Sequence, residues 1–185
     1  MPLKNTSKRY GSVSRFFHWT SSILIIGMLA FGLWMTSLER SSFKFQLYDI
    51  HKSLGLTILI LVILRIFWRL LNKTPAYPSS IPRWEQKLAH TFHGLFYLLI
   101  LSIPLSGWMM STAAQYFPNF WGLGRWIMPG VPASESLAKL GSQVHSFLAY
   151  VMIVMLVLHV SVALKHHFLA KNNILKRMLP FSKDP

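Results

Sequence analysis

Histidine is the residue type in this 185-residue sequence that could carry chemistry. The chain has eight histidines, no cysteine and five acidic residues. A neutral imidazole ligates metals, and near neutral pH it can also accept or donate a proton. Without cysteine, disulfides, iron–sulfur clusters and thiolate zinc sites are excluded for this sequence. The candidates for metal or proton chemistry are therefore His18, His51, His90, His93, His145, His159, His166 and His167.

The spacing of four histidines predicts two paired sites. His145 and His159 are separated by 14 residues, which in a helix is about 21 Å and within roughly 40° of four whole turns. They therefore share one helix face, with one imidazole near each end. His18 and His51 lie at matching depths on two other predicted helices. Two imidazoles on facing helices saturate a haem iron, so this arrangement suits two b-type haems that transfer electrons instead of activating oxygen.

Four long apolar segments must position these histidines. Hydrophobic residues make up 52% of the chain and charged residues 13%, whereas a soluble domain carries about 25% charged residues. A helix that spans the bilayer core needs about 20 apolar residues. We expect such helices at about 16–38, 47–71, 88–113 and 140–168, and a short surface helix on anionic lipid at about 172–181. The sequence predicts an all-α membrane protein with a single membrane domain over 1–185, a four-transmembrane-helix bundle that encloses two b-type haems.

The basic residues predict the orientation of this bundle. The two tails and the connection after the second span carry 14 of the 19 Lys and Arg residues, and the other two connections carry five. Loops rich in Lys and Arg stay on the cytoplasmic side. We therefore expect both termini in the cytoplasm and loops 39–46 and 114–139 on the outer side. Because these charges lie between apolar runs, the formal net charge of +14 does not indicate nucleic-acid binding.

The other histidines have simpler interpretations. His90 and His93 have the i, i+3 spacing of a metal pair, but no nearby carboxylate or thiolate completes such a site. His166 and His167 lie at the end of the last span and suit a membrane interface. No acidic residue lies in the interior of any span, which disfavours a di-iron carboxylate bundle or an ion pump. A non-redox membrane protein with interfacial histidines remains an alternative.

Four short motifs resemble one protein family. They are RFFHW, YDIHKSLG, VHSFLAY and VLHVSVALKHH. Their order and spacing over about residues 10–180 are similar to the bacterial cytochrome b561 family, whose members are four-helix dihaem proteins of the bacterial inner membrane. The resemblance implies that His18 pairs with His159 and His51 with His145 as haem-iron ligands. These are the pairs that helix depth also indicates.

The resemblance also implies a reaction. Some members of the family are superoxide oxidases, which take an electron from superoxide at the outer, periplasmic face and reduce ubiquinone in the membrane. A histidine just after the fourth helix has been linked with the quinone, and His166 holds the matching position. We therefore predict a superoxide:ubiquinone oxidoreductase, an enzyme with lipid, superoxide and ubiquinone as partners and no obligatory protein partner.

Lys52 is the residue predicted to guide superoxide. It follows His51 directly, and an ammonium group there would attract a small anion. An anchoring role, with the ammonium group reaching the lipid headgroups, is an equally good interpretation. The second functional hypothesis is a dihaem electron-carrier subunit that serves another donor or a partner redox enzyme.

Overall fold

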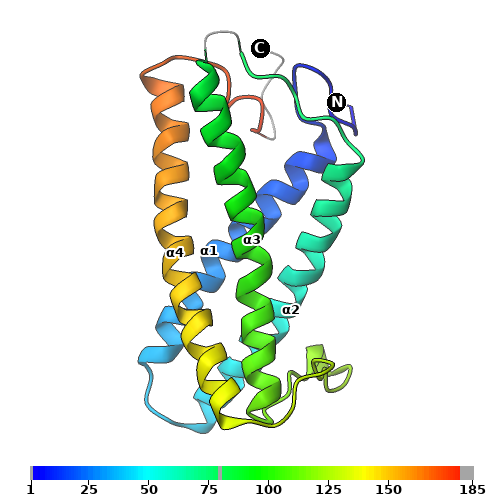
Figure 1. The fold of residues 1–185 in the computed structure, drawn as a ribbon, viewed down its shortest axis with the longest axis vertical. Helices are drawn as coiled ribbons and strands as arrows, with labels where there is room; N and C mark the ends of the chain where they lie inside the picture. The colour runs from blue at the N-terminus through cyan, green and yellow to red at the C-terminus, as the bar shows by residue number, and fades with distance from the viewer. Residues whose placement is uncertain (1, 79–80, 180–185) are drawn as a thin grey trace.

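The computed structural model describes residues 2–78 and 81–179, which form four long helices (Figure 1). The helices are α1 (Ser12–Ser37), α2 (Ser42–Leu70), α3 (Arg83–Ala113) and α4 (Glu135–Phe168), with a short 3-10 helix, η1 (Phe120–Gly122), between α3 and α4. Each of the four long helices is long enough and apolar enough to cross a membrane. The predicted all-α membrane class with four spanning helices is confirmed.

Each long helix begins four or five residues before the apolar run that predicted it. Ser41 caps α2 by accepting a hydrogen bond from the Lys44 amide at 3.2 Å, and Ser134 caps α4 by accepting one from the Leu137 amide at 3.3 Å. Serine at this position satisfies amide groups that a helix start leaves without partners. The apolar runs therefore mark the membrane-spanning parts, whereas the capping residues mark where the helices start.

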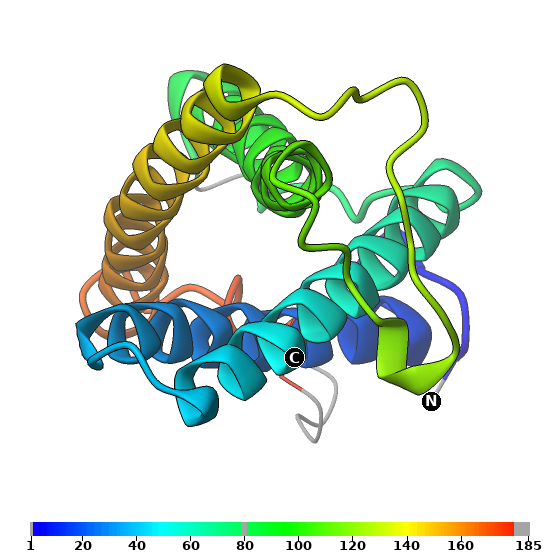
Figure 2. The same ribbon diagram turned by 90° about the horizontal axis from the view of Figure 1, so that it is seen from below.

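The helices form an up-and-down bundle (Figure 1). The N-terminal tail, the α2–α3 connection and the tail after α4 lie at one end, which we call the inner end. The α1–α2 turn and the α3–α4 connection lie at the opposite, outer end. In Figure 2, α1 and α2 run side by side and α3 stands beside α4. The α2 helix also packs against α3 and joins the two pairs.

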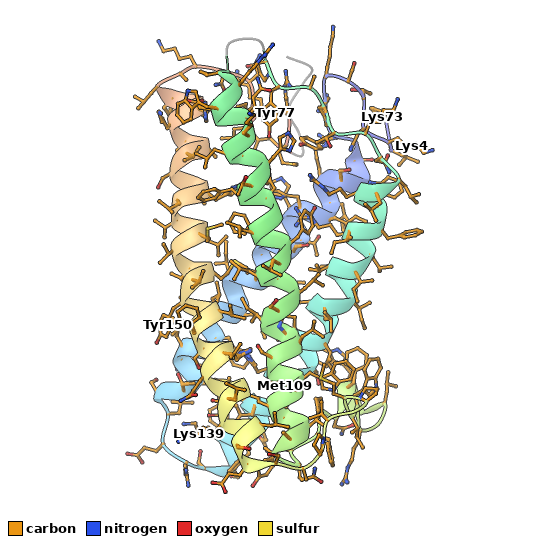
Figure 3. All side chains as sticks on the ribbon, in the orientation of Figure 1. Lys4, Lys73, Tyr77, Met109, Lys139 and Tyr150 are labelled. Atoms are coloured by element: carbon orange, nitrogen blue, oxygen red, sulfur yellow. The ribbon has the colours of Figure 1, made fainter. Side chains whose placement is uncertain are left out.

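Basic side chains gather at the inner end, as the charge pattern of the sequence requires. Lys4 and Lys73 lie at this end and Lys139 at the other (Figure 3). Many large apolar side chains on the spanning helices face outward, including Ile23, Leu98 and Val157. An apolar outer belt with charged ends is the surface that a bilayer solvates.

The buried core lies in the middle of the bundle. Its side chains come from α2, α3 and α4: Ile58, Val62, Leu99, Ile100, Met152 and Met155. Met152 is only 1% exposed and stands seven residues from each of His145 and His159. The core thus separates an outer and an inner level of histidines.

The connection between α3 and α4 folds over the outer end of α2. Ser53 donates a hydrogen bond from its hydroxyl to the Asn119 carbonyl at 3.2 Å and accepts one from the Trp121 amide at 3.3 Å. The Trp121 indole nitrogen donates to the Thr57 hydroxyl at 3.0 Å, and the Trp108 indole donates to the Trp126 carbonyl at 2.9 Å. This covering segment, residues 114–134, is therefore fixed beside the outer histidines.

The described part of the C-terminal tail differs from the predicted surface helix at 172–181. Residues 174–178 form hydrogen-bonded turns, without a regular helix, and the end of the prediction, 180–181, lies outside the described residues. The reason is competition from α1: the Trp19 indole donates to the Met178 carbonyl at 2.9 Å, and the Arg15 guanidinium donates to the Leu179 carbonyl at 3.0 Å. The tail packs over the start of α1.

Candidate functional site

Two pairs of histidines face each other inside the bundle, at the two predicted levels. At the outer level, the rings of His51 on α2 and His145 on α4 have centroids 6.1 Å apart. At the inner level, the centroids of His18 on α1 and His159 on α4 are 6.5 Å apart. The structure therefore brings together the residues that the sequence paired by depth.

These separations fit two imidazoles on opposite sides of one metal atom. Metal–imidazole bonds are about 2 Å long, which puts the two nitrogen atoms about 4 Å apart and the ring centroids about 6 Å apart. Within the described residues, no cluster of three or more His, Asp or Glu side chains could hold a metal ion. A pair of histidines is nevertheless sufficient for haem, because the porphyrin supplies the other ligands. Both pairs therefore have a separation at which they could hold a haem.

The outer pair borders a cavity of about 370 Å³ whose lining comes from all four long helices. The lining is mostly apolar, and it includes Gly32 and Gly107. A Cβ atom built on Gly107 would lie 3.1 Å from the His145 ring, and one on Gly32 would lie 3.4 Å from the His51 ring. The two glycines leave room for the histidine rings. An apolar cavity of this kind suits a macrocycle and excludes water.

Hydrogen bonding fixes the orientation of His145. Its Nδ1 donates to the Ile103 carbonyl of α3 at 2.8 Å, which leaves Nε2 unprotonated and available as a ligand. Ser106 also donates from its hydroxyl to this carbonyl, at 2.8 Å. The opposing His51 has a buried Nδ1 without a hydrogen-bond partner among the described residues.

The inner pair has basic and aromatic surroundings. A guanidinium nitrogen of Arg65 lies 3.3 Å from His18 Nδ1. Arg65 and Arg69 both lie over the Tyr97 ring, with guanidinium carbons 5.5 and 5.3 Å from its centroid. No acidic side chain of the described residues pairs with either arginine. The inner level is therefore cationic.

His93 is a third imidazole at the inner level. Its ring centroid lies 6.1 Å from that of His159, as close as the partner proposed from the sequence. His93 is on α3, however, which packs along α4, whereas α1 does not pack along α4 to a comparable extent in the described structure. A macrocycle needs space between the helices that carry its ligands, and this favours His18 over His93 as the partner of His159.

The remaining histidines lie at the inner end. His166 Nε2 is 3.8 Å from a Glu85 carboxylate oxygen, and His166 Nδ1 is 2.9 Å from the Asn172 amide nitrogen. His167 packs edge-on against Phe168, and His90 packs edge-on against Tyr77. His166 therefore has polar partners, whereas His167 and His90 pack against aromatic rings.

A folded cap covers the inner histidines. Asn5 in the N-terminal tail donates to the Lys73 carbonyl at 2.9 Å, and Arg177 donates to the Ala76 carbonyl at 2.6 Å. Burial raises the pKa of both Tyr10 and Tyr77 above the ordinary value of 10.0, so these phenols stay neutral. The two tails and the α2–α3 connection thus form one structure over the inner level.

Lys52 borders the outer cavity beside His51. Its ammonium group lies 2.7 Å from an Asp49 carboxylate oxygen and donates to the Tyr116 carbonyl at 3.3 Å. The Asp49 side chain is 59% exposed, so water screens the pair. Lys52 therefore lies next to the outer histidine pair, but Asp49 partly balances its charge.

Paired, half-buried histidines between apolar spanning helices are typical of membrane-bound haem proteins that transfer electrons. A profile of the prokaryotic cytochrome b561 family matches residues 9–181 of the chain. The chain belongs to this family and is a membrane-embedded electron-transfer cytochrome of oxidoreductase type with b-type haem. The predicted family is confirmed.

Three relatives align over nearly the whole chain. Cytochrome b561 homolog 2 of Escherichia coli (strain K12) is 36% identical over 186 residues, which cover 97% of this chain and 95% of that protein. A probable superoxide oxidase CybB of Yersinia pestis is 30% identical over 179 residues, 94% of this chain and 97% of that protein. Cytochrome b561 homolog 1 of Escherichia coli (strain K12) is 25% identical over 176 residues, 95% of this chain and 99% of that protein.

Several contacts at the site were not predicted from the sequence. They involve the Ile103 carbonyl, Ser53, Arg65, Glu85 and Asn172. The polar residues Ser53 and Asn172 carry no motif, and the Ile103 contact uses a backbone carbonyl that every residue has. Glu85 had a signal in the sequence, because it is an acidic residue in a segment otherwise rich in Lys and Arg.

Proposed function

We propose that the protein is a dihaem cytochrome of the bacterial inner membrane, with both termini in the cytoplasm. His18 and His159 would hold the inner haem, and His51 and His145 the outer one. The observation that carries this proposal is the separation of 6.5 and 6.1 Å between the rings of the two pairs. When bound, the haems would supply one-electron transfer.

The electron donor in this proposal is superoxide at the periplasmic face, and the acceptor is ubiquinone. Each superoxide gives up one electron and becomes oxygen. Two such electrons and two protons reduce ubiquinone to ubiquinol. Support comes from the Yersinia pestis relative, which is named a probable superoxide oxidase, and from the Lys52 ammonium group that borders the outer cavity. His166, at the inner end, is the proposed contact of the quinone.

Lys52 is the proposed guide for superoxide. Because Asp49 partly balances its charge, the two residues should act in opposite directions. We expect Lys52→Gln to slow haem reduction by superoxide severalfold at low salt, and Asp49→Asn to accelerate it. Both effects should fade as salt rises, because surface charges are screened over about 8 Å at physiological ionic strength. Rates that are equal in all three proteins and insensitive to salt would remove this role of Lys52.

One observation supports a second function, that of an electron-carrier subunit for a partner redox enzyme. The covering segment at the outer end exposes large apolar side chains, with Trp121 52%, Leu123 80% and Ile127 54% exposed. Such a surface binds either the headgroup region of the membrane or another protein.

Stopped-flow mixing of the oxidised, purified protein with superoxide separates the two functions. The superoxide-oxidase proposal predicts rapid reduction of the haems, its loss when superoxide dismutase is present, and reoxidation on addition of ubiquinone. Haems that stay oxidised under superoxide but are reduced by other donors would favour the electron-carrier function instead.

A further inference from the structure

A chain of polar side chains at the inner end holds His166 in one orientation. The Ile174 amide donates to the Asn172 side-chain oxygen at 3.3 Å. A backbone amide can only donate, so this contact identifies the oxygen of the Asn172 amide group. The other end of that group, its NH₂, therefore faces His166 Nδ1 at 2.9 Å.

This chain determines which nitrogen of His166 carries the proton. An NH₂ group donates, so Nδ1 of the neutral ring must accept and Nε2 must hold the hydrogen. Nε2 is also the atom that lies 3.8 Å from the Glu85 carboxylate. The side chains of His166 and Glu85 are 15% and 23% exposed, so the contact is largely shielded. The tail thus directs the Nε2–H donor of His166 toward Glu85.

A small cavity lies at the same place. It measures about 170 Å³, and Glu85, His166, Lys165 and Asn172 contribute to its lining. Lys165 is the other charged residue of the lining and brings a cation from α4. The apolar part of the lining comes from Ile81, Pro82 and Ala170. A cavity with one apolar side and an imidazole N–H suits a carbonyl group on an apolar ring.

His166 also lies in line with the inner histidine pair. It follows His159 by seven residues, which is about 10.5 Å along the helix and within roughly 20° of two whole turns. His145, Met152, His159 and His166 therefore form one stripe along α4. An acceptor at His166 would be adjacent to the inner haem on the face of α4 that carries the haem ligands.

Glu85 has a distinct place among the acidic residues. Of the five in the sequence, Glu39, Asp49 and Glu135 belong to the outer end, and Asp184 lies outside the described residues. Glu85 is thus the one carboxylate in the described part of the inner end. A carboxylate with partial exposure can take up protons from water and pass them to a molecule bound in the cavity.

We propose that Glu85, His166 and Asn172 form a proton relay that serves quinone reduction at the cytoplasmic rim. This inference deepens the proposed function and rests on it. The quinone gains two electrons by way of the haems and two protons to form the hydroquinone. His166 Nε2–H donates a hydrogen bond to the quinone oxygen, and the two protons come from Glu85, which takes up a proton from the cytoplasmic water before each transfer. Asn172 is a positioning residue, because it holds the proton on Nε2.

The test compares two oxidants of the reduced holoprotein. Ubiquinone-1 needs protons, whereas ferricyanide takes one electron and no proton. We expect Glu85→Gln to slow reoxidation by ubiquinone-1 at least about tenfold, since general acids contribute 10²–10⁴-fold, and to leave reoxidation by ferricyanide unchanged. Glu85→Asp should restore most of the rate. Glu135→Gln, at the outer start of α4, is the matched control and should behave as the wild type.

The pH profile provides a second readout. In Glu85→Gln, protons must come directly from water, so the ubiquinone-1 rate should fall more steeply with rising pH than in the wild type. A wild-type ubiquinone-1 rate in Glu85→Gln, or an equal loss with both oxidants, would overturn the relay. A comparison with His166→Ala shows which part of the proposal is wrong if the prediction fails. If that variant is slow with ubiquinone-1 while Glu85→Gln is normal, only the relay is wrong. If both are normal, the proposed quinone site is wrong as well.

Discussion

The outer and inner histidine pairs have similar ring separations, but the charges around the outer pair are balanced, whereas the inner pair has cationic surroundings. At the outer level, His145 donates to a backbone carbonyl, and the nearby Lys52 ammonium is paired with a carboxylate. At the inner level, a guanidinium of Arg65 lies against His18, and Arg69 is close by over the same tyrosine ring.

This difference bears on the direction of electron transfer. A carbonyl that accepts from an axial histidine makes the ligand more electron-donating and stabilises oxidised iron. A cation beside a ligand disfavours the additional positive charge of oxidised iron. In the proposed dihaem protein, the inner haem should therefore have the higher reduction potential. Electrons would then pass from the outer to the inner level, as a donor outside and an acceptor at the cytoplasmic rim require.

The largest expected effect concerns haem binding at the inner level, where His93 is a third imidazole beside His18 and His159. We expect His18→Ala to lose the inner haem, because α1, unlike α3, does not pack closely along α4 among the described residues. His93→Ala should keep both haems, although its ring is as close to His159. Haem content per chain, measured on purified protein, decides between them. Loss of a haem in His93→Ala with retention in His18→Ala would reverse the assignment.

A smaller effect is expected from filling the space beside the outer ligand. In Gly107→Ala, the new Cβ would lie 3.1 Å from the His145 ring, tighter than an ordinary contact, so the ring must shift. We expect reduced occupancy of the outer haem and an altered reduced spectrum, with the inner haem unchanged. Gly27→Ala is the matched control, since nothing lies within 4 Å of a Cβ there. Equal spectra for both variants would contradict the close fit.

The smallest effect tests the electrostatic difference itself. We expect Arg65→Gln to lower the potential of the inner haem by an amount comparable to a tenfold change in its one-electron equilibrium, about 59 mV. Arg65→Lys, which keeps the charge, should lower it less. Potentiometric titration should show one of two steps moving. If the lower-potential step moves, or if neither step does, Arg65 does not create the asymmetry.

The sequence predicts the spans and the histidine levels because both depend on periodicity within one helix. His145 and His159 share a face of α4 whatever surrounds them, and the apolar runs identify the four helices. The starts of α2 and α4 were expected five residues too late because their caps, Ser41 and Ser134, lie outside the apolar runs.

The differences between the two levels were not predictable in this way. Arg65 and His18 are 47 residues apart, and His145 and Ile103 are 42 residues apart. Such contacts depend on how the helices are rotated against each other. The tail was expected to form a surface helix, but Arg15 and Trp19 of α1 bind its carbonyl groups. Periodicity within the tail contains no information about these partners.

The central claim is that two histidine pairs bind two haems at separate levels. The most direct test is haem content per chain, together with the reduced α-band, for the wild type, His145→Ala and His159→Ala, with helix content confirmed by circular dichroism. We predict two haems in the wild type and one in each variant, with the remaining α-band differing between the variants. Two haems retained in either variant, or a wild type with one haem or none, would contradict the account.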